Sequence, residues 1–332
     1  MSAPATQEDG ALAASRKAFA SARGSDALDA LGWWGLLSDP PEAEMRAEMH
    51  ATMLALFRAQ GLALGDTCAL GALLARPYLR AESGSGKVVA AIRRVSPRRG
   101  PIDLVVGDVT AVDAFLLDSP GDGARVIRRN DATLRPVDVA GRLTLNEVVA
   151  SAPPLSSIPE DVARAARARS LFLGRVAATF EILGAAEAAL ALAAEYSTVR
   201  VQFGDPIAKF QAVRHLLAWA RTDCAAIEAL ALQARDFADD APERLDEIAK
   251  AIAGRNGRRA CERSLQVLGA IGFTAEHEHH HFHGRVLVLD ALLGSSADLT
   301  HGLGAWLRES GRIPDLPGAF LLPDATLSEE AR

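Results

Sequence analysis

Hydrophobic residues recur at helical spacing in the first and last parts of the chain and cluster in short runs between them. The first pattern predicts helices within residues 11–80. Breaks are expected at Gly32, at Asp39-Pro-Pro41 and at Gly61, and Arg76-Pro77 closes the region. The first part of the chain is therefore expected to be a small helical domain.

Short β-like runs follow a flexible break at Glu82-Ser-Gly-Ser-Gly86. The expected strands are Lys87–Val95, Asp103–Val106, Ala114–Leu117, Arg125–Arg128 and Arg142–Val149. Because no helical segment separates them, they predict a small antiparallel sheet or a partial barrel. A sheet of this size is too small to be stable alone, so we expect it to pack on the surrounding helices.

Helical spacing returns at Ile158-Pro-Glu-Asp161, where acidic residues suit the first turn of a helix. The expected helices cover residues 159–198, 205–238, 242–269, 278–292 and 296–310. This order of elements predicts an α+β protein. Its parts are an N-terminal helical domain (1–82), a small antiparallel β-domain (83–152), a C-terminal four-helix bundle (153–315) and a tail (316–332). The Trp33-Trp34 pair, among leucines, is expected in the core.

Composition narrows the function classes. The chain has 332 residues, 49% of them hydrophobic and 23% charged, which is ordinary for a soluble globular protein. Its net charge of −6 argues against nonspecific nucleic-acid binding. Cys68, Cys224 and Cys261 are odd in number and lack metal-ligand spacing, so we expect a reducing, cytoplasmic location. The N-terminal residues predict no signal peptide, and no eighteen-residue apolar window is expected to span a membrane.

The motif Arg200-Val-Gln-Phe-Gly-Asp-Pro-Ile-Ala-Lys-Phe-Gln-Ala-Val-Arg-His215 lies between two expected helices. Gly204 permits a turn, and Asp205 is expected to be an N-cap, with Pro206 at the first helical position. A helix N-terminus beside an arginine is an anion site. The motif therefore predicts a site for a dinucleotide pyrophosphate.

A second motif, Gln266-Val-Leu-Gly-Ala-Ile-Gly-Phe273, follows in the same helical region. Together the two motifs resemble the flavin-contacting signatures of the acyl-CoA dehydrogenase family, RxQFGxPIxxFQ and QxxGGxGF. The resemblance is close over the C-terminal helices and weak over the sheet. It implies that Arg200 and Gln202 contact the diphosphate and adenylate of an FAD molecule bound to a neighbouring subunit.

The resemblance gives further residues of both motifs a role beside FAD. It implies that Gln266 meets the adenine side of FAD. The glycines that let the family's backbone approach the phosphate and ribose correspond here to Gly269 and Ala270, and Ala270 adds one methyl group. An apolar wall beside the adenine would be formed by Phe203, Ile207 and Phe210. The alternative is that these three side chains only hold two helices together.

The family reaction, α,β-desaturation of an acyl-CoA, needs a carboxylate to take the α-proton while a hydride leaves to the flavin. The two positions that usually hold it correspond here to Leu292-Leu293-Gly294 and to Gly174, so both carboxylates are missing. Glu181 remains as a candidate base, flanked along its helix by Gly and Ala. Such flanks place it against a closely packed helix or on a cavity floor, and a purely structural carboxylate is the alternative. Residues 87–107 also lack the Thr and Trp that cover the flavin ring in relatives.

The segment Glu276-His-Glu-His-His-His-Phe-His-Gly-Arg285 looks like a metal centre, because His277 and His281, or His279 and His283, are spaced as zinc ligands can be. No cysteine accompanies them in the sequence, so we expect no metal. The interpretations that remain are a solvated or interface helix and a ligand-facing histidine.

These observations lead to the hypothesis that the chain is a subunit of an FAD-dependent acyl-CoA dehydrogenase. It resembles the short, degenerate subunit of bacterial heteromeric enzymes that act on steroid side chains or other bulky CoA esters. A full-length homologue, in an α2β2 heterotetramer, would supply the base, and an electron-transfer flavoprotein or similar acceptor would reoxidise the flavin. One alternative is a non-catalytic scaffold or binding protein that has lost flavin. The other is a self-sufficient homo-oligomeric dehydrogenase that uses Glu181.

Overall fold

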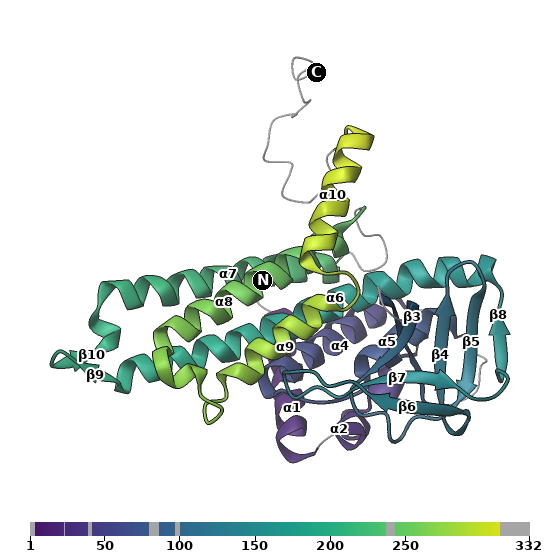
Figure 1. Ribbon diagram of the computed structural model, residues 1–332, viewed down its shortest axis with the longest axis horizontal. Helices are drawn as coiled ribbons and strands as arrows, with labels where there is room; N and C mark the ends of the chain where they lie inside the picture. The colour runs from purple at the N-terminus through teal and green to yellow at the C-terminus, as the bar shows by residue number, and fades with distance from the viewer. Residues whose placement is uncertain are drawn as a thin grey trace.

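The structure is a computed structural model that describes residues 4–22, 24–38, 42–79, 86–96, 100–236 and 243–312. The expected break at Asp39-Pro-Pro41, most of the flexible segment 82–86 and the tail 316–332 lie outside these ranges. The described parts confirm an α+β protein with helices at both ends of the sequence and small sheets between them (Figure 1).

The N-terminal region is helical as expected. It contains α1 (Pro4–Ser21), α2 (Gly24–Ala30), α3 (Trp33–Leu36), α4 (Ala43–Ala63), α5 (Ala69–Ala75) and the 3-10 turn η1 (Arg76–Tyr78). Gly32 breaks the chain as predicted, with a φ of +64° before α3. Trp33 is fully buried with its ring edge on Phe57 at 5.7 Å between centroids, which confirms its place in the core.

Eight strands form two four-stranded sheets. One has the order β1 (Val88–Ala90), β4 (Ala114–Ser119), β5 (Gly123–Arg128), β8 (Ser156–Ile158), and the other β2 (Ile92–Ser96), β3 (Gly100–Val106), β7 (Leu145–Ala150), β6 (Ala132–Pro136). The pairs are antiparallel as predicted, except that β1 and β4 are parallel. The single strand expected at Lys87–Val95 is divided between the two sheets at Ala91, and β6 and β8 were not predicted. Strand β8 is polar and only three residues long, so its sequence carries no strand pattern.

The C-terminal bundle contains α6 (Glu160–Val199), α7 (Gln211–Asp236), α8 (Leu245–Leu268), α9 (His279–Ala291) and α10 (Ser296–Ser310). Figure 1 shows α6 running the length of the molecule, with the sheets near its first half and the hairpin β9–β10 at its far end, while α10 projects from the bundle. Contrary to expectation, α6 has a membrane-length apolar window with a mean hydropathy of 1.6. That window is 72% buried inside the protein, as a central core helix would be.

The helix expected from residue 205 begins later, at Gln211. The intervening residues form β9 (Val201–Gln202), β10 (Asp205–Pro206) and the turn η3 (Ile207–Lys209). Asp205 is therefore a strand residue and not an N-cap. The hairpin turns at Phe203 and Gly204, whose φ angles are +52° and +87°, so the prediction of a turn at Gly204 is confirmed.

Helices α4 and α6 pack with their backbones in close approach, and this explains why Gly61 lies inside α4 instead of ending it. A Cβ added to Gly61 would lie 2.1 Å from the carbonyl oxygen of Glu181. A Cβ added to Gly184 would lie 2.0 Å from the carbonyl oxygen of Arg58. Of the two settings expected for Glu181, the closely packed helix is the one found.

This contact predicts that Gly184→Ala destabilises the fold, because the added methyl group must push the backbones of α4 and α6 apart. Overpacking of this kind costs about 1–3 kcal/mol. Urea denaturation followed by circular dichroism measures the change in the free energy of unfolding. The matched control is Gly302→Ala in α10, where no atom lies within 4 Å of the added Cβ and stability should be unchanged or slightly higher. Equal stability of the wild type and Gly184→Ala would contradict the proposed contact.

Candidate functional site

The fold brings the two sequence motifs together at the far end of the bundle. A small apolar cluster there contains Ala193 of α6 and Val267 and Leu268 of α8, with Tyr196 and Ile207 packed against it. This cluster fixes the hairpin β9–β10 against the end of α8, where η4 (Gly269–Phe273) begins. The residues that the resemblance assigns to FAD therefore share one end of one bundle.

The polar residues of this end project into solvent. Arg200, Gln202 and Gln266 are exposed, and no hydrogen bond or ion pair within the described part of the chain engages the side chain of Arg200. Gly269 is half-buried with a φ of +64°, and Ala270 is exposed, so its methyl group meets no neighbour inside the chain that would force it aside. The arrangement presents an arginine and two amides outward, as a site shared with another molecule would.

The three apolar residues of the first motif divide between the two expected roles. Ile207 packs on the cluster at the bundle end, so for this residue the helix-holding alternative is what the structure shows. Phe203 is 93% exposed and touches Phe210 only edge-on, at 6.1 Å between centroids. Phe273 of the second motif is likewise 78% exposed. Exposed aromatic side chains of this size are typical of surfaces that contact another molecule.

A separate cleft of about 420 Å³ lies between the sheets and the bundle. The two positions where the family usually holds its base converge beside it. A Cβ added to Gly174 would lie 2.9 Å from Cδ1 of Leu293 and 2.5 Å from Cδ2 of Leu74. Because leucine side chains fill the place of either carboxylate, this cleft contains no general base at the two usual positions.

Three cations hold the loop that carries Leu293. Arg94 donates to the carbonyl of Ala291 at 2.8 Å and Arg175 to that of Leu293 at 3.0 Å. Lys250, fully buried, donates from Nζ to the carbonyls of Asp290 at 3.1 Å and Gly294 at 3.3 Å. Burial lowers the pKa of Lys250 to about 8, although Asp290 opposes that shift. The loop is thus fixed with its leucine against Gly174.

The cleft does not fit a flavin ring bound in the family's manner. Its wall from the β-domain consists of Ala90–Val95 with Leu116, Asp118 and Pro120, and none of these residues is Thr or Trp. Arginines line it instead, and they are paired: Arg167 with Asp118 at 2.8 Å and Arg175 with Asp246 at 2.8 Å. None of the side chains that the β-domain contributes to this cleft is a hydroxyl or aromatic group that could cover an isoalloxazine.

Glu181 lies in neither of these places. Its carboxylate is 1% exposed, with Oε1 accepting from Arg285 at 2.6 Å and Oε2 accepting from Gln60 at 3.0 Å. Arg285 also donates to the carbonyls of Gly65, Gly141 and Arg142 at 2.8 to 2.9 Å. Glu181 lines none of the four main hollows of the described residues that border the sheets and the bundle, and its side chain lies instead between α4 and α9. This geometry favours the structural alternative over the catalytic one.

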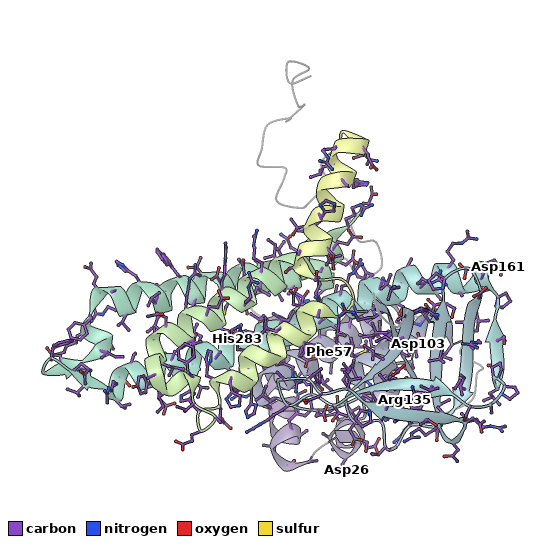
Figure 2. The ribbon with its side chains drawn as sticks, viewed as in Figure 1. Asp26, Phe57, Asp103, Arg135, Asp161 and His283 are labelled. Carbon is purple, nitrogen blue, oxygen red and sulfur yellow. The ribbon has the colours of Figure 1, made fainter. Side chains whose placement is uncertain are left out.

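The histidine segment divides between core and surface. His279 is buried, and its ring Nε2–H donates to the carbonyl of Cys261 at 2.9 Å. His280 is exposed, while His277, His281 and His283 are half-buried; Figure 2 labels His283 on α9. No group of three metal-ligating side chains occurs among residues 4–312 as far as these are described.

The sequence patterns did not identify Arg285, Lys250 and Arg175 as residues that hold distant loops in place through their backbone carbonyls. Arg285 follows Phe282 and precedes Val286 and Leu289 on the apolar face of α9. A charged side chain in the middle of an apolar face needs a buried partner of opposite charge. The position of Arg285 in such a face was therefore the sequence signal for a buried ion pair. Nothing in the sequence near Lys250 or Arg175 identifies the carbonyls that they hold, because those carbonyls come from a distant loop.

Comparisons with known proteins found similarity over the C-terminal helices. The model of the acyl-CoA dehydrogenase C-terminal domain matches residues 164–304. Acyl-CoA dehydrogenase FadE34 of Mycobacterium tuberculosis (strain ATCC 25618 / H37Rv) is 34% identical over 158 residues, which cover 46% of this chain and 21% of that protein. The matched stretches span between about a fifth and two fifths of the length of the curated relatives.

Solved structures share the fold over nearly the whole chain. A Tcur3481-Tcur3483 steroid ACAD variant has a TM-score of 0.76 at 18% identity, covering 92% of this chain and 99% of that one. The ChsE4-ChsE5 complex from Mycobacterium tuberculosis has a TM-score of 0.69 at 18% identity, covering 91% and 97%. At this identity the likeness shows a common fold.

The buried histidine predicts acid-sensitive stability. Burial lowers the pKa of His279 from 6.5 to about 4, so the folded state keeps the ring neutral while the unfolded chain protonates it. Between pH 6.5 and 4 the unfolded state binds more protons, and stability falls as the pH falls, by at most about 3 kcal/mol. Urea denaturation at pH 7 and pH 4.5 should show a smaller acid loss in His279→Gln than in the wild type. The same loss in both proteins would assign the acid sensitivity to other groups.

Proposed function

We propose that this chain, whose C-terminal helices match the acyl-CoA dehydrogenase C-terminal domain, is a non-catalytic subunit of an FAD-dependent acyl-CoA dehydrogenase. In this proposal it completes the flavin site of a partner subunit, and the partner supplies the base and the flavin-covering loop. The observation that carries the proposal is the contrast between the two sites. The cleft has leucines where the base belongs, while the bundle end keeps its outward-facing arginine and amides.

Distance supports a site shared between chains. Gly174, beside the cleft, and Arg200, at the bundle end, lie at either end of 26 residues of α6 and its C-cap. At 1.5 Å per residue they are about 39 Å apart along the helix axis. One extended FAD molecule cannot bridge that separation within a single chain. The diphosphate motif therefore serves a flavin whose ring lies in the cleft of another subunit.

FAD is the cofactor that the family indicates. When bound, it accepts the β-hydrogen of the acyl chain as a hydride. On this chain Arg200 would pair with its diphosphate and Gln202 and Gln266 would bond its adenylate. Phe203 would supply apolar contact, since its ring is already free of the chain's own core.

The proposed partner is a full-length acyl-CoA dehydrogenase homologue in an α2β2 assembly, acting on a steroid side chain or another bulky CoA ester. The fold shared with a steroid ACAD and with the two-component ChsE4-ChsE5 complex supports this proposal. The exposed aromatic residues at the bundle end supply the kind of surface that a partner covers. Free, buried Cys68, Cys224 and Cys261 are consistent with the proposed cytoplasmic location, and an electron-transfer flavoprotein or similar acceptor would take the electrons.

The proposed shared site predicts the flavin content of the chain alone and of its complex. The chain purified alone should be flavin-poor, and co-expression with a full-length acyl-CoA dehydrogenase homologue from the same genome should give a yellow complex. Arg200→Ala in that complex should lower FAD affinity about tenfold or more, because a charge-assisted bond to phosphate contributes about 1.5–3 kcal/mol. Visible absorbance and a flavin count measure the effect, with the exposed bundle arginine in Arg258→Ala as the control.

A bright yellow chain with one FAD per molecule when made alone would contradict the proposal of a shared site. A co-expressed complex that contains no flavin would favour the scaffold alternative. Unchanged FAD affinity in Arg200→Ala would place the diphosphate elsewhere.

Another prediction distinguishes a base supplied by the partner subunit from Glu181 acting as the base. Glu181→Gln keeps the shape of the side chain and its hydrogen bond from Arg285, but it removes the buried ion pair. We expect a less stable complex whose turnover per bound flavin stays near normal. A catalytic Glu181 instead predicts a loss of at least about 100-fold. Stopped-flow flavin bleaching by an acyl-CoA, normalised to flavin content, decides between them, and a dead variant with normal FAD and ligand binding would establish the self-sufficient alternative.

A further inference from the structure

Helices α7 and α8 lie side by side in the bundle, and α7 begins where α8 ends, at the bundle end that carries both motifs (Figure 1). The outward side of α8 consists of exposed residues at three- and four-residue spacing: Arg255, Arg258, Arg259, Glu262 and Gln266. They form one stripe along the helix, about 16 Å long. The stripe ends at Gln266, which the proposed function places against FAD.

Positive charge on this stripe is not balanced. Arg258 pairs with Glu262 at 3.6 Å, so these two residues add no net charge. Arg255 donates to the amide oxygen of Asn256 at 3.4 Å, and neither it nor Arg259 has a carboxylate partner among the described residues. The whole chain has a net charge of −6, so this local excess of positive charge is opposite to the overall composition.

An exposed tryptophan lies beside the stripe. Trp219 of α7 is 59% exposed, and the guanidinium of Arg263 on α8 lies 5.5 Å from its ring centroid. Arg263 is held in turn by the carboxylate of Asp223, and it donates to the carbonyl of Trp219 at 3.3 Å. The indole is therefore fixed at the surface before any partner binds, as the anchor residues of protein interfaces often are.

The charge of this surface distinguishes between occupants. A second copy of the chain, seated on it by a twofold axis, would bring the unpaired arginines of both copies together, and like charges across an interface are unfavourable. A protein surface that carries carboxylates would instead be complementary in charge and would bury the indole.

The proposed shared flavin site lies close by. Arg259 is two helical turns, about 10 Å, from Gln266 along α8. A subunit that brings its flavin to Gln266 therefore comes close to the unpaired arginines. The occupant that fits both the charge and the position is the partner subunit.

We propose that Trp219, Arg255 and Arg259, together the α7–α8 face, bind a carboxylate-bearing surface of the partner subunit. This inference rests on the proposed function, because it names the face through which that subunit docks. The indole supplies the apolar contact, and the two guanidiniums pair with carboxylates of the partner. The same face disfavours an isologous dimer of the chain, so it directs assembly toward the heteromer.

Isothermal titration calorimetry of the full chain with a full-length acyl-CoA dehydrogenase homologue from the same genome tests the face. At 50 mM NaCl the double variant Arg255→Gln/Arg259→Gln should raise Kd at least about fivefold, and at 300 mM NaCl the difference should shrink, because salt screens exposed charges. Trp219→Ser should raise Kd at least about tenfold at both salt concentrations, since an apolar contact is not screened. Circular dichroism checks that each variant is folded.

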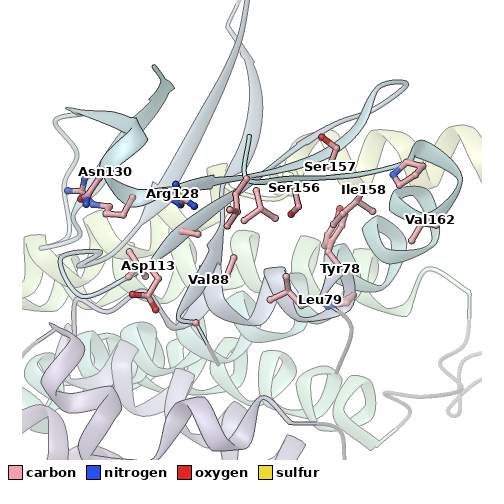
Figure 3. A pocket seen from close by; sticks show the side chains of 18 of the residues that line it. Tyr78, Leu79, Val88, Asp113, Arg128, Asn130, Ser156, Ser157, Ile158 and Val162 are labelled. Carbon is pink, nitrogen blue, oxygen red and sulfur yellow. The ribbon is translucent and has the colours of Figure 1, made fainter. Parts of the chain in front are cut away.

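The matched control is Arg128→Gln. Arg128 is an exposed arginine of β5 that lines a hollow of the β-domain, far from the bundle end in sequence, and its loss should leave Kd unchanged (Figure 3). If the wild-type proteins associate but the double arginine variant or Trp219→Ser binds as tightly as the wild type, this inference is overturned and the proposed function stands. If the wild-type proteins do not associate, both are overturned.

Other occupants are tested with the chain alone. Sedimentation velocity should show no dimer that the double arginine variant weakens, because such a dimer would place a second copy on the face and overturn the proposal. Heparin and phosphatidylglycerol vesicles represent nucleic acid-like and lipid polyanions. Binding of either probe as tightly as the homologue, and lost in the double arginine variant, would also overturn it.

Discussion

The structure depends on one buried ion pair, between Glu181 of α6 and Arg285 of α9. Both residues are buried, with Arg285 fully buried and the Glu181 side chain 2% exposed, so each charge would be severely destabilising without the other. The pair also reaches outside the bundle. Gln60 of the N-terminal helices donates to the carboxylate, and the guanidinium donates to carbonyls of the N-terminal region and the β-domain. All three parts of the chain therefore meet at a single arginine, and its fixed fork of donors sets how they dock.

This constraint bears directly on function. A buried carboxylate with both oxygens hydrogen-bonded is not free to approach a substrate carbon. The close approach of α4 and α6 at Gly61 and Gly184 closes the space around Glu181 further. The acid that looks most like a remaining base is thus the one most committed to holding the fold. In this structure Glu181 holds the fold together, and its carboxylate is not placed to act as a base.

The sequence was sufficient for the helices of the bundle, the α+β class and most strands, because each has a clear hydrophobic period. Prediction from the sequence was wrong where the backbone adopts a geometry that the local residue types do not indicate. The pair Asp205-Pro206 is typical of the start of a helix. In the structure, however, the backbone N–H of Ile207 donates to the carbonyl of Arg200 at 2.8 Å, so a hairpin forms before the next helix begins. Gly61 was expected to break a helix, but in the structure it allows α4 and α6 to pack closely. The partners of Glu181 lie 104 and 121 residues away in sequence, and no local pattern identifies them.

The absence of a base in the cleft follows from the packing of several residues together and not from a change at one position. A side chain at Gly174 would meet Leu74 and Leu293, so a carboxylate there needs both leucines to move. Leu293 in turn sits in a loop whose carbonyls are held by Arg94, Arg175 and Lys250. Burial already depresses the pKa of Lys250, so a further change in its surroundings would shift the charge that holds the loop. The leucines and the held loop therefore leave no carboxylate at the two usual positions in the cleft, while Arg200, Gln202 and Gln266 at the bundle end remain exposed to solvent.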